Sequence, residues 1–87
     1  MDTKAYVYIL ECKDHTYYTG YTTDVENRLK MHNLGRGAKY TRARRPCRLV
    51  YSKACDSKSS AMKLEYKIKQ LSRKEKVDLI LGVLKEF

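Results

Sequence analysis

Two short runs rich in β-branched and aromatic residues, separated by a polar turn, constrain the fold of this chain most. Residues 5–10 read Ala-Tyr-Val-Tyr-Ile-Leu, and residues 17–21 read Tyr-Tyr-Thr-Gly-Tyr. Such runs favour strands, and the polar residues between them predict an antiparallel hairpin. In such a pair Tyr8 and Tyr18 can lie on neighbouring strands and face the same side. Gly20 indicates either a bulge or a close backbone approach.

A helix is predicted after the hairpin, between a capping box and a glycine. Thr23 is the expected N-cap with Glu26 three residues on, and Gly35 is the expected C-terminal stop. On this helix Arg28 and His32 are four residues apart, so they share one face.

The rest of the chain is predicted to form a loop, a third strand and two more helices. Residues 36–47 lack a clear periodicity, whereas residues 48–52 contain the apolar run Leu-Val-Tyr. Asp56 or Ser57 can cap the next helix, and a capping box at Ser72 opens the last one. The predicted inward faces consist of Ala61, Leu64, Ile68 and Leu71, and of Val77, Ile80, Leu81 and Leu84. The expected order is β-β-α-β-α-α, an α+β domain with a small sheet backed by helices.

The charge balance favours a polyanionic partner. Lysine and arginine number 19 against 10 acidic residues, a net charge of +9 in 87 residues. Such a field favours nucleic acid. A lysine-rich solubilising surface is the plain alternative, and an anionic membrane is a weaker one. A chain of this length is predicted to form a single domain, residues 1–87, and its 43% hydrophobic content supports a packed core.

The cysteines indicate neither a disulfide framework nor a zinc site. Cys12, Cys47 and Cys55 cannot all pair within one chain, and no Cys-x-x-Cys motif is present. Reduced, partly buried thiols in a cytoplasmic protein are therefore expected. The longest apolar run, Leu79 to Leu84, is too short to span a bilayer.

Several side chains together supply what phosphodiester cleavage needs. Arg28 can hold a phosphate through two parallel hydrogen bonds, and the carboxylate of Glu65 can hold one Mg²⁺ or Mn²⁺. His32 is the conventional proton carrier, and a tyrosine hydroxyl can relay a proton once cationic surroundings lower its pKa from about 10. The plain alternatives are a half-buried strand aromatic for Tyr8, a solvated Arg28, a helix-capping His32, and a Glu65 paired with Lys69.

A basic segment follows the first predicted helix. It places six cations between residues 36 and 48 with no acid among them. Cations of this kind mostly contact the backbone of nucleic acid, so low sequence specificity is expected. The residues predicted to bind nucleic acid are Arg36, Lys39, Tyr40, Arg42, Arg44, Arg45 and Arg48.

The order and spacing of these residues resemble the GIY-YIG nucleases. The name records two short motifs, which here are 6–8, Tyr-Val-Tyr, and 18–20, Tyr-Thr-Gly, and the similarity continues through residues 24–33 to Glu65. It covers roughly residues 4–84 and is greatest to the small stand-alone bacterial members. The sequence departs from the family pattern at three positions. Tyr6 stands in place of the glycine of the first motif, Thr19 in place of the usual isoleucine of the second, and Tyr21 where excision-repair relatives carry a lysine.

The resemblance implies a fold, a chemistry and a set of site residues. The fold is a three-stranded antiparallel sheet flanked by helices. Tyr8 and Tyr18 would be active-site tyrosines, one of them assisting deprotonation of the attacking water. Arg28 would stabilise the phosphate, His32 would be a neighbouring proton-transfer or positioning group, and Glu65 would be the single metal ligand. Gly20 is expected to be structural even if the site is real.

The expected function is a metal-dependent endonuclease that hydrolyses DNA with low sequence specificity in repair or recombination, with a branched or nicked substrate left open. The alternative is a non-catalytic nucleic-acid binding module, in which the tyrosine hairpin is a stacking or packing surface. A third and weaker option is a domain that recruits a larger repair or recombination complex. A homodimer or protein partner is compatible with the sequence, but no feature demands either.

Overall fold

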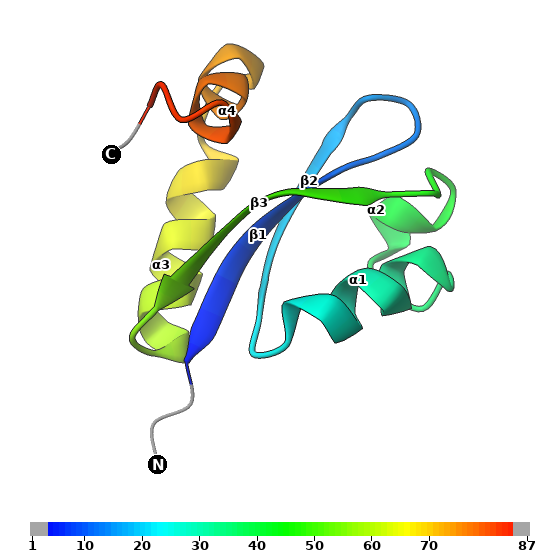
Figure 1. The fold of residues 1–87 in the computed structure, drawn as a ribbon, viewed down its shortest axis with the longest axis horizontal. Helices are drawn as coiled ribbons and strands as arrows, with labels where there is room; N and C mark the ends of the chain where they lie inside the picture. Colours follow the sequence, from blue (N-terminus) through cyan, green and yellow to red (C-terminus); the bar gives the residue numbers. More distant parts are fainter. Residues whose placement is uncertain (1–3, 85–87) are drawn as a thin grey trace.

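A three-stranded antiparallel sheet with helices on both sides organises the protein (Figure 1). The computed structural model describes residues 4–84, so the ends of the predicted 1–87 domain lie outside the described residues. The elements in chain order are β1 (Ala5–Glu11), β2 (Tyr17–Thr22), α1 (Val25–Asn33), α2 (Lys39–Arg42), β3 (Arg48–Cys55), α3 (Lys58–Lys69) and α4 (Arg73–Ile80). The predicted fold class is confirmed, with one additional short helix.

The central strand β1 pairs with both neighbours, in the order β2-β1-β3. The predicted hairpin is confirmed, and its register places Gly20 opposite Tyr8. That register runs without a shift, so the bulge considered at Gly20 is wrong. The irregularity lies instead in the pairing of β1 with β3, between Ile9 and Leu10.

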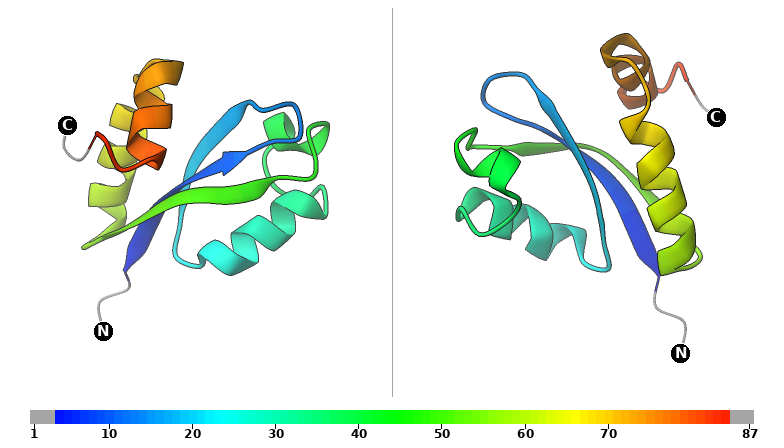
Figure 2. Two further views of the ribbon diagram at one scale, coloured as in Figure 1. Left: turned by 45° about the horizontal axis from the view of Figure 1, so that its top comes forward. Right: turned by 180° about the vertical axis from the view of Figure 1, so that it is seen from behind.

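Strand β1 is buried on both faces because helices cover both sides of the sheet. Alternate side chains of a strand point to opposite faces, so β1 contributes to two separate cores. The views in Figure 2 place α3 and α4 on one side and α1 and α2 on the other. The core under α3 and α4 contains Ala5, Val7, Ile9, Ala61, Ile68 and Leu79, and the core under α1 contains Tyr8, Leu10, Cys12 and Cys47. All three cysteines are free thiols, as expected.

The helix ends follow local capping chemistry, with one departure from the prediction. Asp24, and not Thr23, is the N-cap of α1, because its carboxylate accepts a hydrogen bond of 3.1 Å from the backbone N–H of Asn27. Gly35 has a φ of 79° and ends this helix as expected. The capping box at Ser72 is confirmed at the start of α4.

Two further predictions were wrong in detail. The expected loop 36–47 contains the single-turn helix α2, which is too short to produce a visible periodicity and which buries Thr41 completely. Leu81 is 70% exposed, although it was predicted to face inward. It caps α4, and Gly82 beyond it has a φ of 81°, so Leu81 leaves the stripe and Leu79 is buried instead. Among residues 4–84, no helix has the length and apolar character needed to cross a membrane.

Replacing the buried anchor of α3 should destabilise the protein strongly. Ile68 has no exposed surface, so Ile68→Ala should lower the free energy of unfolding by about 2–5 kcal/mol through lost burial and the cavity left behind. Met62 on the same helix is 48% exposed and serves as the control, with an expected loss of about 0.5 kcal/mol or less for Met62→Ala. Urea unfolding measures both, and equal losses would contradict the assignment of the core.

Candidate active site

One pocket brings together four of the predicted site residues. Tyr8, Tyr18, Arg28 and Glu65 all line a cavity of about 410 Å³. They come from β1, β2, α1 and α3, and this lining places the pocket at the β2 side of the sheet. The fold therefore brings residues that are far apart in the sequence into one pocket.

The pocket also contains residues that the sequence prediction missed. Lys58 lines it from the first turn of α3, and Tyr21 and Thr23 line it from β2 and the turn that follows. Lys58 is seven residues before Glu65, which is two helical turns, so helical spacing alone would have placed both on one face. The pocket is therefore richer in cations than the predicted set.

The two tyrosines pack against each other on the face of the sheet that α1 covers. Their ring centroids are 6.3 Å apart, and the planes are inclined by 44°. Gly20 makes this arrangement feasible, because a Cβ at that position would lie 2.6 Å from the hydroxyl oxygen of Tyr8. A side chain at residue 20 would displace the Tyr8 ring.

His32 lies behind Tyr8 and is not part of the pocket wall. Only 1% of its surface is exposed. The Tyr8 hydroxyl lies 2.9 Å from His32 Nε2, and Thr41 Oγ1 lies 2.7 Å from His32 Nδ1. The imidazole thus connects the pocket to α2. Gly37 leaves room for it, since a Cβ there would collide with the ring.

The surrounding hydrogen bonds assign the tautomer of His32. Thr41 Oγ1 donates to the carbonyl oxygen of Ala38 at 2.9 Å, so its single proton is used and Nδ1–H must be the donor toward Oγ1. Nε2 is then the acceptor for the Tyr8 hydroxyl. The N–H of Ala38 lies 3.4 Å from Nδ1 and would favour the opposite tautomer. The two hydrogen bonds of Thr41 Oγ1 are shorter than this contact, so the proton is assigned to Nδ1.

Burial keeps both members of the Tyr8–His32 pair neutral at neutral pH. The pKa of Tyr8 is raised by burial first and by Tyr18 next, while Arg28 acts in the opposite direction. The pKa of His32 is lowered by burial and then by Arg28. The expected lowering of the tyrosine pKa by cationic surroundings is therefore overcome, because desolvation is the larger effect at this position.

Glu65 is the carboxylate of the pocket and has a lysine partner. Its side chain is 20% exposed, and Oε2 lies 3.6 Å from Nζ of Lys69, which is itself 49% exposed. A partly exposed pair at this distance is weak, so the carboxylate is available to a stronger cation. Residues 4–84 contain no cluster of three or more His, Cys, Asp or Glu side chains. The donor set fits a hydrated divalent ion held by one protein carboxylate, the mode that Mg²⁺ prefers.

The sequence of the chain matches the model of a known protein family. Residues 4–78 match the profile of the GIY-YIG catalytic domain. The chain belongs to the GIY-YIG family. The family is one of nucleases, which implies a nucleic-acid substrate.

The relatives of this GIY-YIG protein are small stand-alone proteins. It is 57% identical to UPF0213 protein SH2523 of Staphylococcus haemolyticus, over 88% of this chain and 94% of the relative. It is 61% identical to UPF0213 protein VNG_2274C of Halobacterium salinarum, over 82% of this chain and 92% of the relative.

Two solution NMR structures share the fold. UPF0213 protein BH0048 from Bacillus halodurans superposes with a TM-score of 0.58 at 58% identity, over 88% of this chain and 82% of that one. Protein EF2693 from E. faecalis superposes with a TM-score of 0.64 at 40% identity, over 100% of this chain and 95% of that one.

The side chains of the basic segment of the GIY-YIG protein differ in whether they make hydrogen bonds within the protein. Arg44 Nε donates to Asp14 at 3.1 Å, and Arg48 Nε donates to Glu11 at 2.9 Å. Arg45 Nε donates to the carbonyl oxygen of Arg42. The exposed side chains of the predicted set without a hydrogen-bond partner among residues 4–84 are those of Arg36, Lys39, Tyr40 and Arg42. Tyr40 alone of this set also stacks on a pocket residue, Tyr18, with centroids 6.1 Å apart.

Removal of the Thr41 hydroxyl should change the tautomer of His32. Thr41→Val takes away the acceptor for Nδ1–H and leaves the N–H of Ala38 as the group that faces Nδ1, so the proton should move to Nε2. Thr41→Ser should retain it on Nδ1. Long-range ¹H–¹⁵N NMR spectra report this directly, because the chain has only two histidines. A proton on Nε2 in the unmodified protein would refute the assignment.

Stability should fall as the pH is lowered through the range of histidine titration. Because the pKa of His32 is lowered in the folded protein, the unfolded chain binds this proton more readily. The resulting loss is absent above the unfolded pKa of about 6.5 and grows as the pH falls below it. Urea unfolding between about pH 7.5 and pH 5.5 should show the decrease, and His32→Gln should make it shallower. Identical pH dependence in both proteins would exclude His32 as the cause.

Proposed function

We propose that this GIY-YIG protein is a metal-dependent endonuclease that hydrolyses phosphodiester bonds in DNA. The observation that carries the proposal is the single pocket lined by Tyr8, Tyr18, Arg28 and Glu65. It offers hydroxyls, a guanidinium and a carboxylate around a space of about 410 Å³, which accommodates a phosphodiester group.

The cations of the pocket provide the binding of the phosphate. Arg28 presents a planar fork that matches two phosphate oxygens, and Lys58 adds a point charge from the same pocket. Both groups neutralise charge that grows on the phosphoryl oxygens as the bond breaks. They bind any phosphodiester, so low sequence specificity follows from their chemistry.

Glu65 would hold a single Mg²⁺ or Mn²⁺. When bound, such an ion supplies positive charge to the phosphoryl oxygens and lowers the pKa of a bound water. Binding at Glu65 competes with its ion pair to Lys69, so that lysine is released when the carboxylate takes an ion. The rest of the site is left to hold the substrate and move protons.

Tyr8 and His32 form the proton route that this chain itself provides. The Tyr8 hydroxyl can receive a proton from water on its pocket side and pass its own proton to His32 Nε2, 2.9 Å away. Burial and Arg28 both oppose a charged His32 in the free protein. A phosphate paired with Arg28 would offset the positive charge that lowers the pKa of His32. Proton transfer from Tyr8 to His32 therefore becomes easier when substrate is bound.

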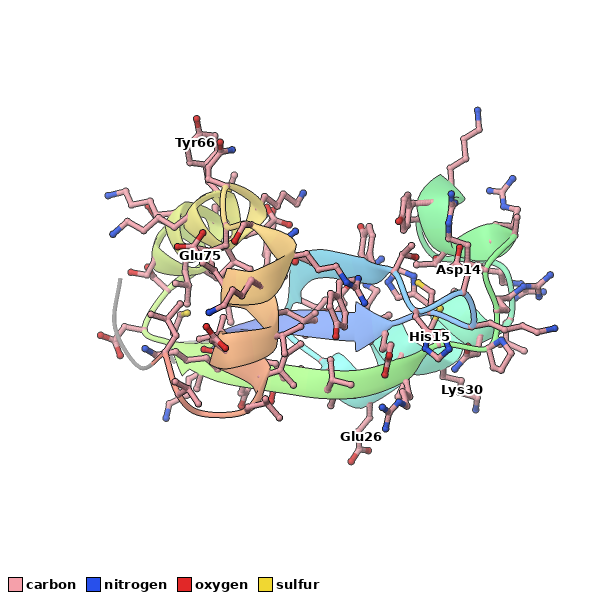
Figure 3. The ribbon with its side chains drawn as sticks, turned by 90° about the horizontal axis from the view of Figure 1, so that it is seen from above. Asp14, His15, Glu26, Lys30, Tyr66 and Glu75 are labelled. Atoms are coloured by element: carbon pink, nitrogen blue, oxygen red, sulfur yellow. The ribbon has the colours of Figure 1, made fainter. Side chains whose placement is uncertain are left out.

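Nicking of supercoiled plasmid DNA by purified protein tests the proposal. Activity should require Mg²⁺ or Mn²⁺ and should fall by about a hundredfold or more in Glu65→Gln and in Arg28→Ala, because each removes charge stabilisation of the transition state. Glu26→Gln is the matched control, since Glu26 points away from α1 into solvent (Figure 3). It should retain full activity.

Two other outcomes would reject the proposal. Equal nicking by all variants would mean that a contaminant cuts the DNA. Salt-sensitive binding without nicking, unchanged by metal or by Glu65→Gln, would assign the protein as a binding module.

A further inference from the structure

A second hollow adjoins the candidate active site along the β2 edge of the sheet. Its volume is about 230 Å³, and Tyr18 lines both spaces. This edge hollow is lined by Tyr17, Tyr18, Thr19, Tyr40, Lys69 and Lys76. It is smaller than the roughly 300–1,000 Å³ sites that take drug-sized ligands, so it suits a smaller flat group.

The aromatic wall of the edge hollow is held in a fixed orientation. The rings of Tyr18 and Tyr40 are nearly parallel, with an interplanar angle of 26°. The guanidinium of Arg44 lies 4.0 Å from the ring centroid of Tyr40, and its Nη1 donates to the carbonyl oxygen of Tyr40 at 2.8 Å. Tyr40 nevertheless remains 39% exposed. The guanidinium covers part of this ring, so the exposed part of a ring held in a fixed orientation is the surface that remains for a ligand to contact.

The remaining walls are cationic and polar. Lys69 and Lys76 line the hollow from α3 and the first half of α4. Thr19 is 4% exposed, and its hydroxyl has no hydrogen-bond partner within residues 4–84. A buried hydroxyl without a partner is unusual, because it costs about 1–3 kcal/mol unless a ligand or water satisfies it. Aromatic, cationic and hydroxyl groups together match the base, phosphate and polar edge of a nucleotide.

We propose that the edge hollow binds one unpaired nucleotide of the DNA strand, next to the phosphodiester held in the active site. This proposal rests on the proposed function, since Tyr18 is the wall that the two spaces share. The base packs against the exposed part of the Tyr40 ring, and Lys76 contacts a phosphate. Lys69 lines the same hollow and would add a second cationic contact, most readily when its ion pair with Glu65 is broken.

An unpaired nucleotide is favoured over a duplex by the geometry of stacking. Within a duplex the faces of each base are covered by its neighbours, so no face is left for Tyr40. Proteins that bind single strands combine aromatic platforms with a cationic groove, which is the combination present at the β2 edge. The favoured substrate is therefore DNA with a single-stranded segment at the cleavage site, such as a flap, a gap or a free single strand.

Fluorescence of 2-aminopurine in a single-stranded oligonucleotide, measured without divalent ions, tests the stacking contact apart from any cleavage. The base should be quenched on binding to the unmodified protein and to Tyr40→Phe, which keeps the ring. Tyr40→Leu should lose the quenching and bind the strand about fivefold or more weakly, the equivalent of about 1 kcal/mol. Tyr66→Ala is the matched control, because Tyr66 projects away from α3 (Figure 3), is 67% exposed, and should behave as unmodified protein.

A variant on a different element keeps the proposal testable if α2 unfolds in Tyr40→Leu. Lys76→Gln lies on α4 and should reduce the salt slope of single-strand affinity by about 0.7 while leaving the slope for duplex unchanged. Quenching by Tyr40→Leu equal to that of the unmodified protein, or an unchanged salt slope in Lys76→Gln, would overturn the proposal.

Cleavage assays separate this proposal from the endonuclease assignment. If no DNA is cleaved but the quenching depends on Tyr40, the nucleotide site stands and the catalytic function fails. If single-stranded and duplex DNA are both cleaved with the same ratio of rates by unmodified protein and by Tyr40→Leu, the catalytic function stands and the nucleotide site fails.

Discussion

The burial of β1 on both faces is the constraint on which the rest of the structure depends. Ala5, Val7 and Ile9 of this strand belong to the core under α3 and α4, whereas Tyr8 and Leu10 belong to the core under α1. Tyr8 is therefore buried as part of a core and is also open to the pocket. Its hydroxyl needs a partner in that position, and His32 supplies it at 2.9 Å. The hydrogen bond to His32 therefore serves both the packing of Tyr8 in the core and the chemistry proposed for its hydroxyl.

That requirement extends through His32 into α2. The imidazole is held between the Tyr8 hydroxyl and Thr41, and Gly37 is needed to let the chain pass close to the ring. The four-residue helix α2 is thus anchored by a buried hydrogen bond and not by an apolar stripe. The same helix presents Tyr40 toward Tyr18, so the hydrogen bond between His32 and Thr41 also helps to position the wall of the edge hollow.

The fold followed from local patterns wherever those patterns were strong. Alternating apolar residues in the hairpin and the stripe of α3 were sufficient to predict their elements, because burial of one face is a local property of the sequence. Helix α2 could not be found this way, since Thr41 is buried against His32, which lies on another helix and leaves no apolar pattern in α2. The assembly of Tyr8, Tyr18, Arg28 and Glu65 was predicted from family resemblance, whereas the direction of the Tyr8 pKa was not. Desolvation depends on the neighbours in space, which a sequence does not display.

The outer strand β3 has a consequence for solubility. It is eight residues long, mostly exposed, and lies at the margin of the sheet with one row of backbone groups unpaired by β1. Such a margin is a template on which another chain can add a strand and begin aggregation. Arg48 and Lys53 are exposed on it, and the bulge opposite Ile9 and Leu10 interrupts its regular pleat. Both features oppose the approach of a second strand to this margin of the sheet.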